Sequence, residues 1–207
     1  MHLAVYPVAA SLLQEGMGMK TALRQTILAM CLVPVMLAGA AGIARPEEAA
    51  DFSPRDVLGL VSDAARAWEP DAFLIYLEND EPLGLEGKSL RWGYLFYSPA
   101  KDQARGYSVR AGSIVAASTL EFKFEAPPLP ETWIDAETAL RAANAKAGTK
   151  YCEENGGEPS TLFLMRAVDE TKPDLTTWTV IYTSPNAPSL FVVVDAVEGK
   201  VRQTWRG

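Results

Sequence analysis

The sequence predicts an α+β protein made of two tandem units, each a short helix packed on an antiparallel sheet of three to four strands. Two observations support this prediction. A helical pattern followed by strand patterns occurs twice, and the Pro-rich run APPLP at 126–130 separates the two occurrences. A short helix above an antiparallel meander can bury one face of that sheet. We therefore expect one unit over 53–125, a connector over 126–132 and a second unit over 133–207. Their sheets either stand side by side or continue into one another.

The first unit opens with a helical pattern in which Ser53 is the expected N-cap and Pro54 the first helical residue. Strands are expected over 72–80 and 89–99, because both stretches are rich in aromatic and branched residues and end at turn signals. The stretch 104–125 follows as one long strand or two shorter ones.

The second unit repeats this order. Asp135 is the expected N-cap of a helix over 136–147, and Gly148 is expected to end that helix. The strand patterns that follow cover 160–168, 176–185 and 189–205, the last as a pair of strands. Trp92 precedes Ser98 at the same spacing as Trp178 precedes Ser184, which supports a repeat in which the first copy is degenerate.

The N-terminal residues have the features of a secretory signal peptide. The stretch 25–44 carries no charge and ends in small residues, and Lys20 and Arg24 precede it. We expect 1–44 to be this signal, with 1–18 as an upstream extension, and 45–52 to be a linker. The stretch 25–44 is also nearly long enough to span a bilayer, so an uncleaved membrane anchor is the alternative. The predicted location is periplasmic or secreted, and contact with the membrane is expected only if the anchor is retained.

Composition and charge exclude several classes of function. The net charge is −7, and acidic proteins do not suit nucleic acid, because phosphate binding depends on Lys and Arg. The one histidine is His2, outside the expected units, so no imidazole base is available for a nucleophilic catalytic site, and His-based zinc sites are excluded. We therefore predict a non-enzymatic protein without cofactors or metals. A hydrolase that uses two carboxylates is a minor alternative.

The second unit resembles the PepSY-type domain of secreted and membrane-associated bacterial proteins. The matching features are the helix motif Ala139-Leu140-Arg141-Ala142-Ala143, Trp178 in a middle strand, and the closing motif Val193-Val194-Asp195-Ala196 with Gly199-Lys200-Val201. The resemblance covers about 133–206, and Val197-Glu198 departs from the usual motif, which has Thr before the Gly. The resemblance implies a non-catalytic, cystatin-like α+β module with an inhibitory or protein-binding role.

Three acidic residues and one thiol are candidates for chemistry. Asp195 is either an acid–base or ligand carboxylate or, as we expect, a residue that turns the chain before Gly199. Glu153 and Glu154 beside Cys152 suggest a metal site, but an exposed acidic loop is favoured in the absence of a nearby histidine. Cys152 has no basic neighbour nearer than Lys150, so an inert thiol is expected.

Aromatic residues supply the candidate binding surface. The side chains in question are Trp92, Tyr94, Trp178, Tyr182 and Trp205. Such residues more often fill a core beneath a sheet, and this is the competing interpretation. We expect binding of a protein or peptide of the bacterial envelope, with exposed sheet edges as docking surfaces. The alternative is a small ligand bound in a cleft between the two units.

Overall fold

One antiparallel sheet of eight strands joins the two halves of the chain in the computed structural model, which describes residues 50–124, 126–169 and 171–207. The strand order is β4-β3-β2-β1-β5-β6-β7-β8. The predicted α+β class is confirmed. The halves do not form separate sheets: they continue into one another through β1 and β5. The predicted signal peptide or anchor lies outside the described residues.

Each half supplies helical residues and four strands. In the first half these are α3 (Leu58–Trp68), β1 (Phe73–Asn79), β2 (Arg91–Ser98), β3 (Gln103–Arg110) and β4 (Ser113–Thr119). In the second half they are α4 (Ala136–Ala143), the π-helical segment η1 (Asn144–Gly148), α5 (Thr149–Asn155), β5 (Glu158–Arg166), β6 (Thr176–Thr183), β7 (Leu190–Asp195) and β8 (Val201–Arg206). The stretch 104–125 therefore contains two strands, joined by a two-residue turn.

The first helix begins later than expected. Regular helix starts at Leu58, because the preceding residues form a turn in which the Asp56 N–H donates to the Ser53 carbonyl at 3.0 Å. The Ser53 hydroxyl accepts a long bond of 3.4 Å from the Arg55 N–H. Ser53 is therefore a turn residue before the helix, and the prediction that it caps α3 is wrong.

The second helical stretch begins where expected and ends later. The Asp135 carboxylate accepts from the Glu137 N–H at 2.7 Å, as an N-cap does. The helix does not end at Gly148 but continues through η1 and α5, and it stops at Gly156, whose φ is +61°. Glu153 and Glu154 therefore lie on α5, so the expected acidic loop is wrong.

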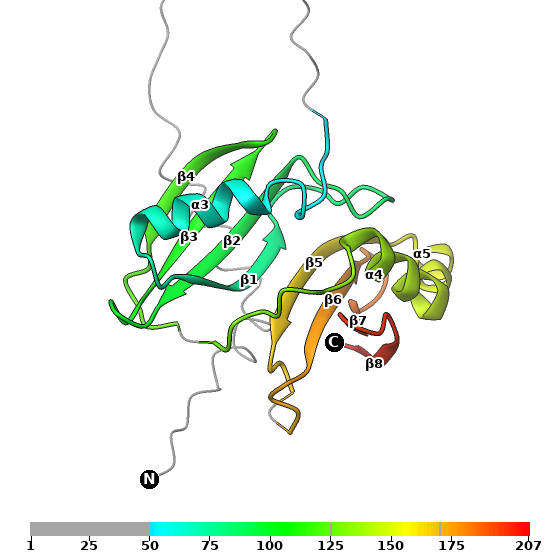
Figure 1. The fold of residues 1–207 in the computed structure, drawn as a ribbon. Coiled ribbons are helices and arrows are strands. Elements are labelled where there is room, and N and C mark those ends of the chain that lie inside the picture. The colour runs from blue at the N-terminus through cyan, green and yellow to red at the C-terminus, as the bar shows by residue number, and fades with distance from the viewer. Residues whose placement is uncertain (1–49, 125, 170) are drawn as a thin grey trace, which may run out of the picture. The chain divides into compact units, whose positions relative to one another are not determined.

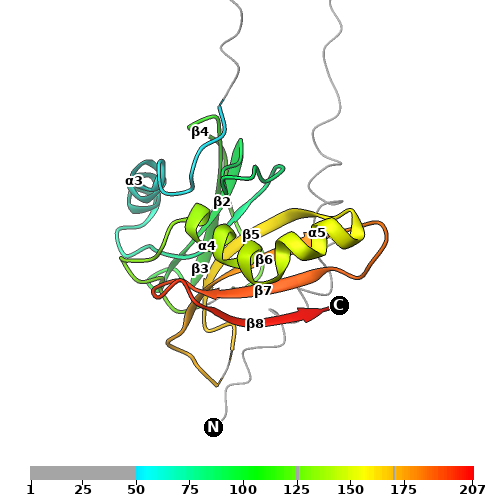
Figure 2. The ribbon, with the colours of Figure 1, turned by 90° about the vertical axis from the view of Figure 1, so that its right-hand side faces the viewer.

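Both helical stretches cover the same face of the sheet (Figures 1 and 2). Side chains from both halves form one apolar core beneath them. Its members include Val61, Ala65, Leu77, Trp92, Tyr94, Tyr107, Leu140, Tyr151, Leu164, Trp178, Tyr182 and Val192. The helices are amphipathic, so burying their apolar faces on the sheet removes both apolar surfaces from water. A smaller cluster around Ile75, Tyr97 and Phe163 lies apart from this core.

The two middle tryptophans make equivalent bonds in the two halves. The Trp92 indole donates to the Phe52 carbonyl at 2.9 Å, and the Trp178 indole donates to the Ile134 carbonyl at 2.8 Å. Each bond ties a central strand to the segment that precedes the helix of its own half. These parallels agree with a tandem repeat, and the unit boundaries at 53–125 and 133–207 stay a prediction.

The junction between the halves is short. Strands β1 and β5 pair at three positions, from Tyr76 opposite Met165 to Glu78 opposite Phe163. The buried Asn79 side chain extends this junction: its amide nitrogen donates to the carbonyls of Glu81 and Ser160, and its oxygen accepts from the Leu162 N–H at 2.6 Å. One side chain therefore bonds the main chain of β5 where strand pairing stops.

None of the helices in the described part of the chain has the length and apolar content needed to cross a membrane.

Candidate functional site

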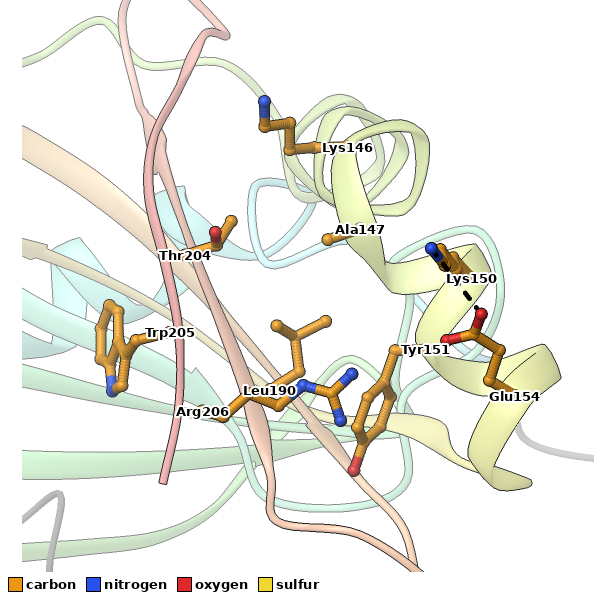
Figure 3. Close-up of a pocket in the computed structure, with 9 residues that line it drawn as sticks. All are labelled: Lys146, Ala147, Lys150, Tyr151, Glu154, Leu190, Thr204, Trp205 and Arg206. Carbon is orange, nitrogen blue, oxygen red and sulfur yellow. Dashed lines mark ion pairs between the residues drawn. The ribbon is translucent and has the colours of Figure 1, made fainter.

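A surface pocket of about 360 Å³ lies between the second helical stretch and the edge strand β8 (Figure 3). The helical stretch contributes Lys146, Ala147, Lys150, Tyr151 and Glu154, and the sheet contributes Leu190, Thr204, Trp205 and Arg206. The helices lie over β5, β6 and β7 and leave β8 beside them (Figure 2). The pocket forms because β8 extends the sheet beyond the width that the helix covers.

A π-helical turn forms the upper wall of the pocket. Lys146 and Ala147 belong to η1, and such turns are rare and occur often at functional sites. Tyr182 anchors the turn from below, because its hydroxyl donates to the Asn144 side-chain oxygen at 2.7 Å. Gly148 allows this approach, since a Cβ atom there would lie 2.3 Å from the Tyr182 ring.

Basic groups predominate in the pocket. Lys146, Lys150 and Arg206 face one acidic residue, Glu154, which lies 3.7 Å from the Lys150 ammonium. Three basic side chains against one acidic leave an excess of two positive charges in a chain whose net charge is −7. The arrangement favours an anionic group.

Tyr151 fixes the floor of the pocket and one of its cations. The tyrosine is buried, and its hydroxyl donates to the Pro188 carbonyl at 3.1 Å. The Arg206 guanidinium lies 4.5 Å from the centre of the Tyr151 ring, within cation–π distance. This contact holds the guanidinium beside the pocket while leaving its N–H groups available to a ligand.

Strand β8 is the last strand of the described sheet and offers backbone groups to a further strand. The Gly207 N–H donates to the Ser189 carbonyl, and bonded and non-bonded pairs alternate along an antiparallel ladder. In this register Gly207, Trp205 and Gln203 form the bonded pairs with β7. The backbone groups of Arg206 and Thr204, which lie between them, therefore point away from β7. Their side chains point toward the helical stretch (Figure 3).

Four of the five aromatic candidates lie in the core. Trp92, Tyr94, Trp178 and Tyr182 are at most 2% exposed, and their polar atoms bond groups inside the protein. Burial raises the pKa of Tyr94 and Tyr182 far above the ordinary tyrosine value, so both stay protonated. The structure brings Trp92 and Tyr94 together under α3, and Trp178 and Tyr182 under the second helical stretch, with no surface offered to a partner.

Trp205 is the aromatic candidate that reaches the surface. It is half-buried and stacks on Phe191, with 4.9 Å between ring centres and an interplanar angle of 4°. Its side chain lies on the opposite side of β8 from Thr204 and Arg206 (Figure 3). The main chain of Trp205 therefore borders the pocket, whereas its ring lies on the opposite face of the sheet.

Asp195 is buried at the end of β7 and shapes the turn into β8. One carboxylate oxygen accepts from the N–H groups of Val197 and Glu198, both at 2.8 Å, and the other accepts two bonds from the Arg202 guanidinium. Burial acts to raise the pKa of Asp195, but these bonds outweigh it, and the pKa lies below its ordinary value. A carboxylate held by four donors is a poor general base, and Gly199, with φ of +70°, completes the turn.

Of the remaining candidates, Glu154 lines the pocket and pairs with Lys150, whereas Cys152 and Glu153 are not among the lining residues. Burial and the nearby Glu158 and Glu153 raise the pKa of the Cys152 thiol, so little reactive thiolate is present at neutral pH. In the parts of the chain that the structure describes, no three His, Cys, Asp or Glu side chains gather as they would around a metal ion.

Sequence patterns do not reveal this pocket. Its two walls come from the separate stretches 146–154 and 190–206, and no motif marks Lys146, Lys150 or Arg206. Arg206 lies directly after the last strand pattern, which ends at Trp205, so the pattern gives no signal for it.

Comparisons with known proteins give no family. No protein-family model and no curated protein sequence matches the chain. Among solved structures, a candidate lipoprotein from Clostridium difficile 630 is 12% identical, with a TM-score of 0.47 over 71% of this chain and 90% of that one. The C-terminal domain of Bacillus megaterium YpeB is 11% identical, with a TM-score of 0.30 over 75% of this chain and 65% of that one. At TM-scores this low two chains need not share a fold, so neither neighbour assigns this chain a family or a function.

Proposed function

We propose that this chain is an exported, non-enzymatic protein that binds an extended segment of a partner protein along the open edge of β8. The observation that carries the proposal is the outward backbone groups of Thr204 and Arg206 on the last strand of the described sheet. An extended segment that adds to such an edge gains main-chain hydrogen bonds, and neighbouring pockets select its side chains.

The sequence supports the other parts of the proposal. The uncharged stretch 25–44 after Lys20 and Arg24 supports export to the periplasm or beyond the cell. The position of the one histidine at residue 2 supports a protein without imidazole catalysis. The helix motif, Trp178 and the closing turn at Asp195 support a PepSY-like module, whose resemblance implies protein binding.

The opposite edge of the sheet is a less suitable docking surface. Strand β4 is exposed along most of its length and carries mainly small side chains, Ala116, Ala117 and Ser118 among them. Small side chains offer little surface for selecting a partner, whereas β8 lies beside the pocket. The described pocket also lies wholly within the second half, so the alternative of a ligand cleft between the halves gains no support from it and stays a prediction.

Photo-crosslinking in the natural host tests the proposal. A photo-reactive amino acid at Gln203, on β8, should join the protein to a segment of one envelope partner, identified by mass spectrometry. The same amino acid at Ser118, on β4, serves as the matched position and should give no such product. The same products from both positions, or none from Gln203, would contradict docking at β8.

A proline pair then tests the role of the main chain. Thr204→Pro removes an outward N–H from β8, and proline is tolerated at such edge positions. The Leu120 N–H donates to the Ala104 carbonyl, so Ala117 is the equivalent outward position on β4. We expect Thr204→Pro to abolish the crosslink and Ala117→Pro to leave it unchanged, with circular dichroism confirming that both variants fold.

A further inference from the structure

We propose that the segment bound by β8 is acidic and that one of its carboxylates lies in the pocket between Lys146 and Arg206. This inference rests on the proposed function, because the pocket selects among segments that pair with β8. It adds the chemical class of the partner, which edge pairing by itself leaves open.

Strand geometry brings a partner side chain to the pocket. The outward backbone groups of Thr204 and Arg206 would bond the added segment, and the side chains of these two residues point toward the helical stretch (Figure 3). Residues directly opposite one another on paired strands point to the same face of the sheet. A partner residue opposite Thr204 or Arg206 therefore directs its side chain to the face where the pocket opens.

The charges at the pocket select an acidic side chain. Lys146 and Arg206 are exposed and form no ion pair with another residue of the described chain, whereas Lys150 has Glu154 at 3.7 Å. A carboxylate opposite Arg206 would accept bonds from the guanidinium, which Tyr151 holds in place, and would lie near the Lys146 ammonium. A basic side chain there would meet the same two cations and be repelled.

A membrane headgroup is the less suitable source of the anion. The chain carries a net charge of −7, which opposes approach to an anionic bilayer. The pocket also opens beside outward main-chain groups, which pair with a polypeptide and find no partner in a lipid headgroup. The observations therefore favour an acidic polypeptide segment.

Fluorescence anisotropy with three labelled peptides tests the inference. The protein is purified from its natural host in the form that the host produces. The peptides alternate Thr and Val and differ at one central position, which is Glu, Gln or Lys. We expect the Glu peptide to bind about fivefold more tightly than the Gln peptide, as for a partly exposed ion pair, and the Lys peptide to bind more weakly still. Added salt should reduce the preference for Glu, because the pairing groups are exposed to solvent.

Two variants identify the cations. Arg206→Gln should bring the Glu peptide to the affinity of the Gln peptide, and Lys146→Gln should do so in part. Lys172→Gln is the matched control, because Lys172 is exposed in the loop before β6 and pairs with Asp169, away from the pocket. It removes the same charge and should leave the preference for Glu unchanged.

The outcomes separate the two proposals. Equal binding of all three peptides overturns the acidic preference and leaves docking at β8 in place. Loss of preference in Lys172→Gln as well as Arg206→Gln attributes the effect to net charge and overturns the pocket. Failure of every peptide to bind, or a sedimentation profile showing that a second copy occupies β8, overturns both proposals. Displacement of the Glu peptide by phosphatidylglycerol vesicles, but not by neutral vesicles, would instead identify a membrane surface as the ligand.

Discussion

Asn79 is a buried side chain that joins the two halves of the chain through hydrogen bonds. It is 8% exposed, donates to the carbonyls of Glu81 and Ser160, and accepts from the Leu162 N–H. These bonds lie where the pairing of β1 with β5 ends, so main-chain groups of β5 depend on one side chain for a partner. A buried polar group that loses its partner keeps its desolvation cost.

Replacing Asn79 with alanine should destabilise the protein by about 2–3 kcal/mol, because the Leu162 N–H and the Ser160 carbonyl then lose the bonds that Asn79 makes with them. The Glu81 carbonyl keeps a bond from the Ser89 hydroxyl. Urea unfolding followed by circular dichroism measures the change. Asn186→Ala is the matched control: its amide is exposed and donates to the Asn155 carbonyl, so a loss below about 0.5 kcal/mol is expected. Equal losses of stability in the two variants would show that the buried Asn79 bonds contribute no more to stability than an exposed hydrogen bond.

Asp195 makes the stability of the protein depend on pH. Its pKa in the folded protein lies below the ordinary value, because Glu198, Val197 and Arg202 together outweigh the effect of burial. A depressed carboxyl pKa stabilises the fold above the unfolded pKa of about 3.9, and this contribution disappears as pH falls through the folded value. The bonds that cause it also close the turn between β7 and β8.

Asp195→Asn should therefore be about 2 kcal/mol less stable than the natural protein at neutral pH, and the gap should narrow below about pH 4. Melting temperatures measured across this range give the comparison. Glu153→Gln, which changes an exposed residue on α5, is the control and should lose less than about 0.5 kcal/mol at neutral pH. If the stability difference between the natural protein and Asp195→Asn stayed constant down to the lowest pH at which both fold, the pKa of Asp195 would not be linked to stability.

At the scale of the elements, two helical glycines have opposite surroundings. A Cβ atom at Gly148 would lie 2.3 Å from the Tyr182 ring, whereas one at Gly59 on α3 would meet nothing within 4 Å. Helix propensity by itself favours alanine over glycine at both positions by about 1 kcal/mol. The close approach of Tyr182 reverses that preference at Gly148.

Gly148→Ala should destabilise the protein by about 1–3 kcal/mol through overpacking, and Gly59→Ala should stabilise it by about 0.5–1 kcal/mol. Thermal unfolding of the two variants side by side measures both signs. Stabilisation by both substitutions would mean that η1 moves away from Tyr182 without cost. Gly148→Ala should also disturb the pocket, because Lys146 and Ala147 belong to the same turn.

The strands could be predicted from the sequence because their signal is local. Trp178, Val180 and Tyr182 share one face of β6 at every second position, and the structure places all three in the core. Helix ends depend on more distant neighbours. In the sequence, Gly148 indicates the end of a helix. The fold shows instead that Tyr182, thirty-four residues later, lies so close that glycine is required inside the helix.

The candidate site could not be predicted, because it also depends on residues that are distant in the sequence. Lys146 and Arg206 become neighbours of one pocket only when β8 is placed at the edge of the sheet beside the helix. The aromatic candidates are large enough to suggest binding from sequence, yet size is also what fits Trp92 and Trp178 to a core beneath a helix.

On the scale of the whole molecule, one continuous sheet couples two halves in which helices and strands follow in a similar order. Residues 49–207 cluster as one compact unit, and the core beneath the helices includes side chains of both halves. The direct strand junction is nevertheless limited to three paired positions and the bonds of Asn79. The shared core therefore has to carry most of the coupling between the halves.

This coupling should make the unfolding of residues 49–207 a single transition. Trp68 and Trp92 report on the first half, and Trp133, Trp178 and Trp205 on the second. Phe variants that keep tryptophan in only one half therefore separate the two signals. Fluorescence and far-ultraviolet circular dichroism should give the same urea midpoint for both halves. Asn79→Ala is the sensitive case: it weakens the junction without removing core side chains, so its midpoints should fall together if the shared core dominates. Midpoints that separate in this variant would show that the halves are independent units held together by the β1–β5 junction.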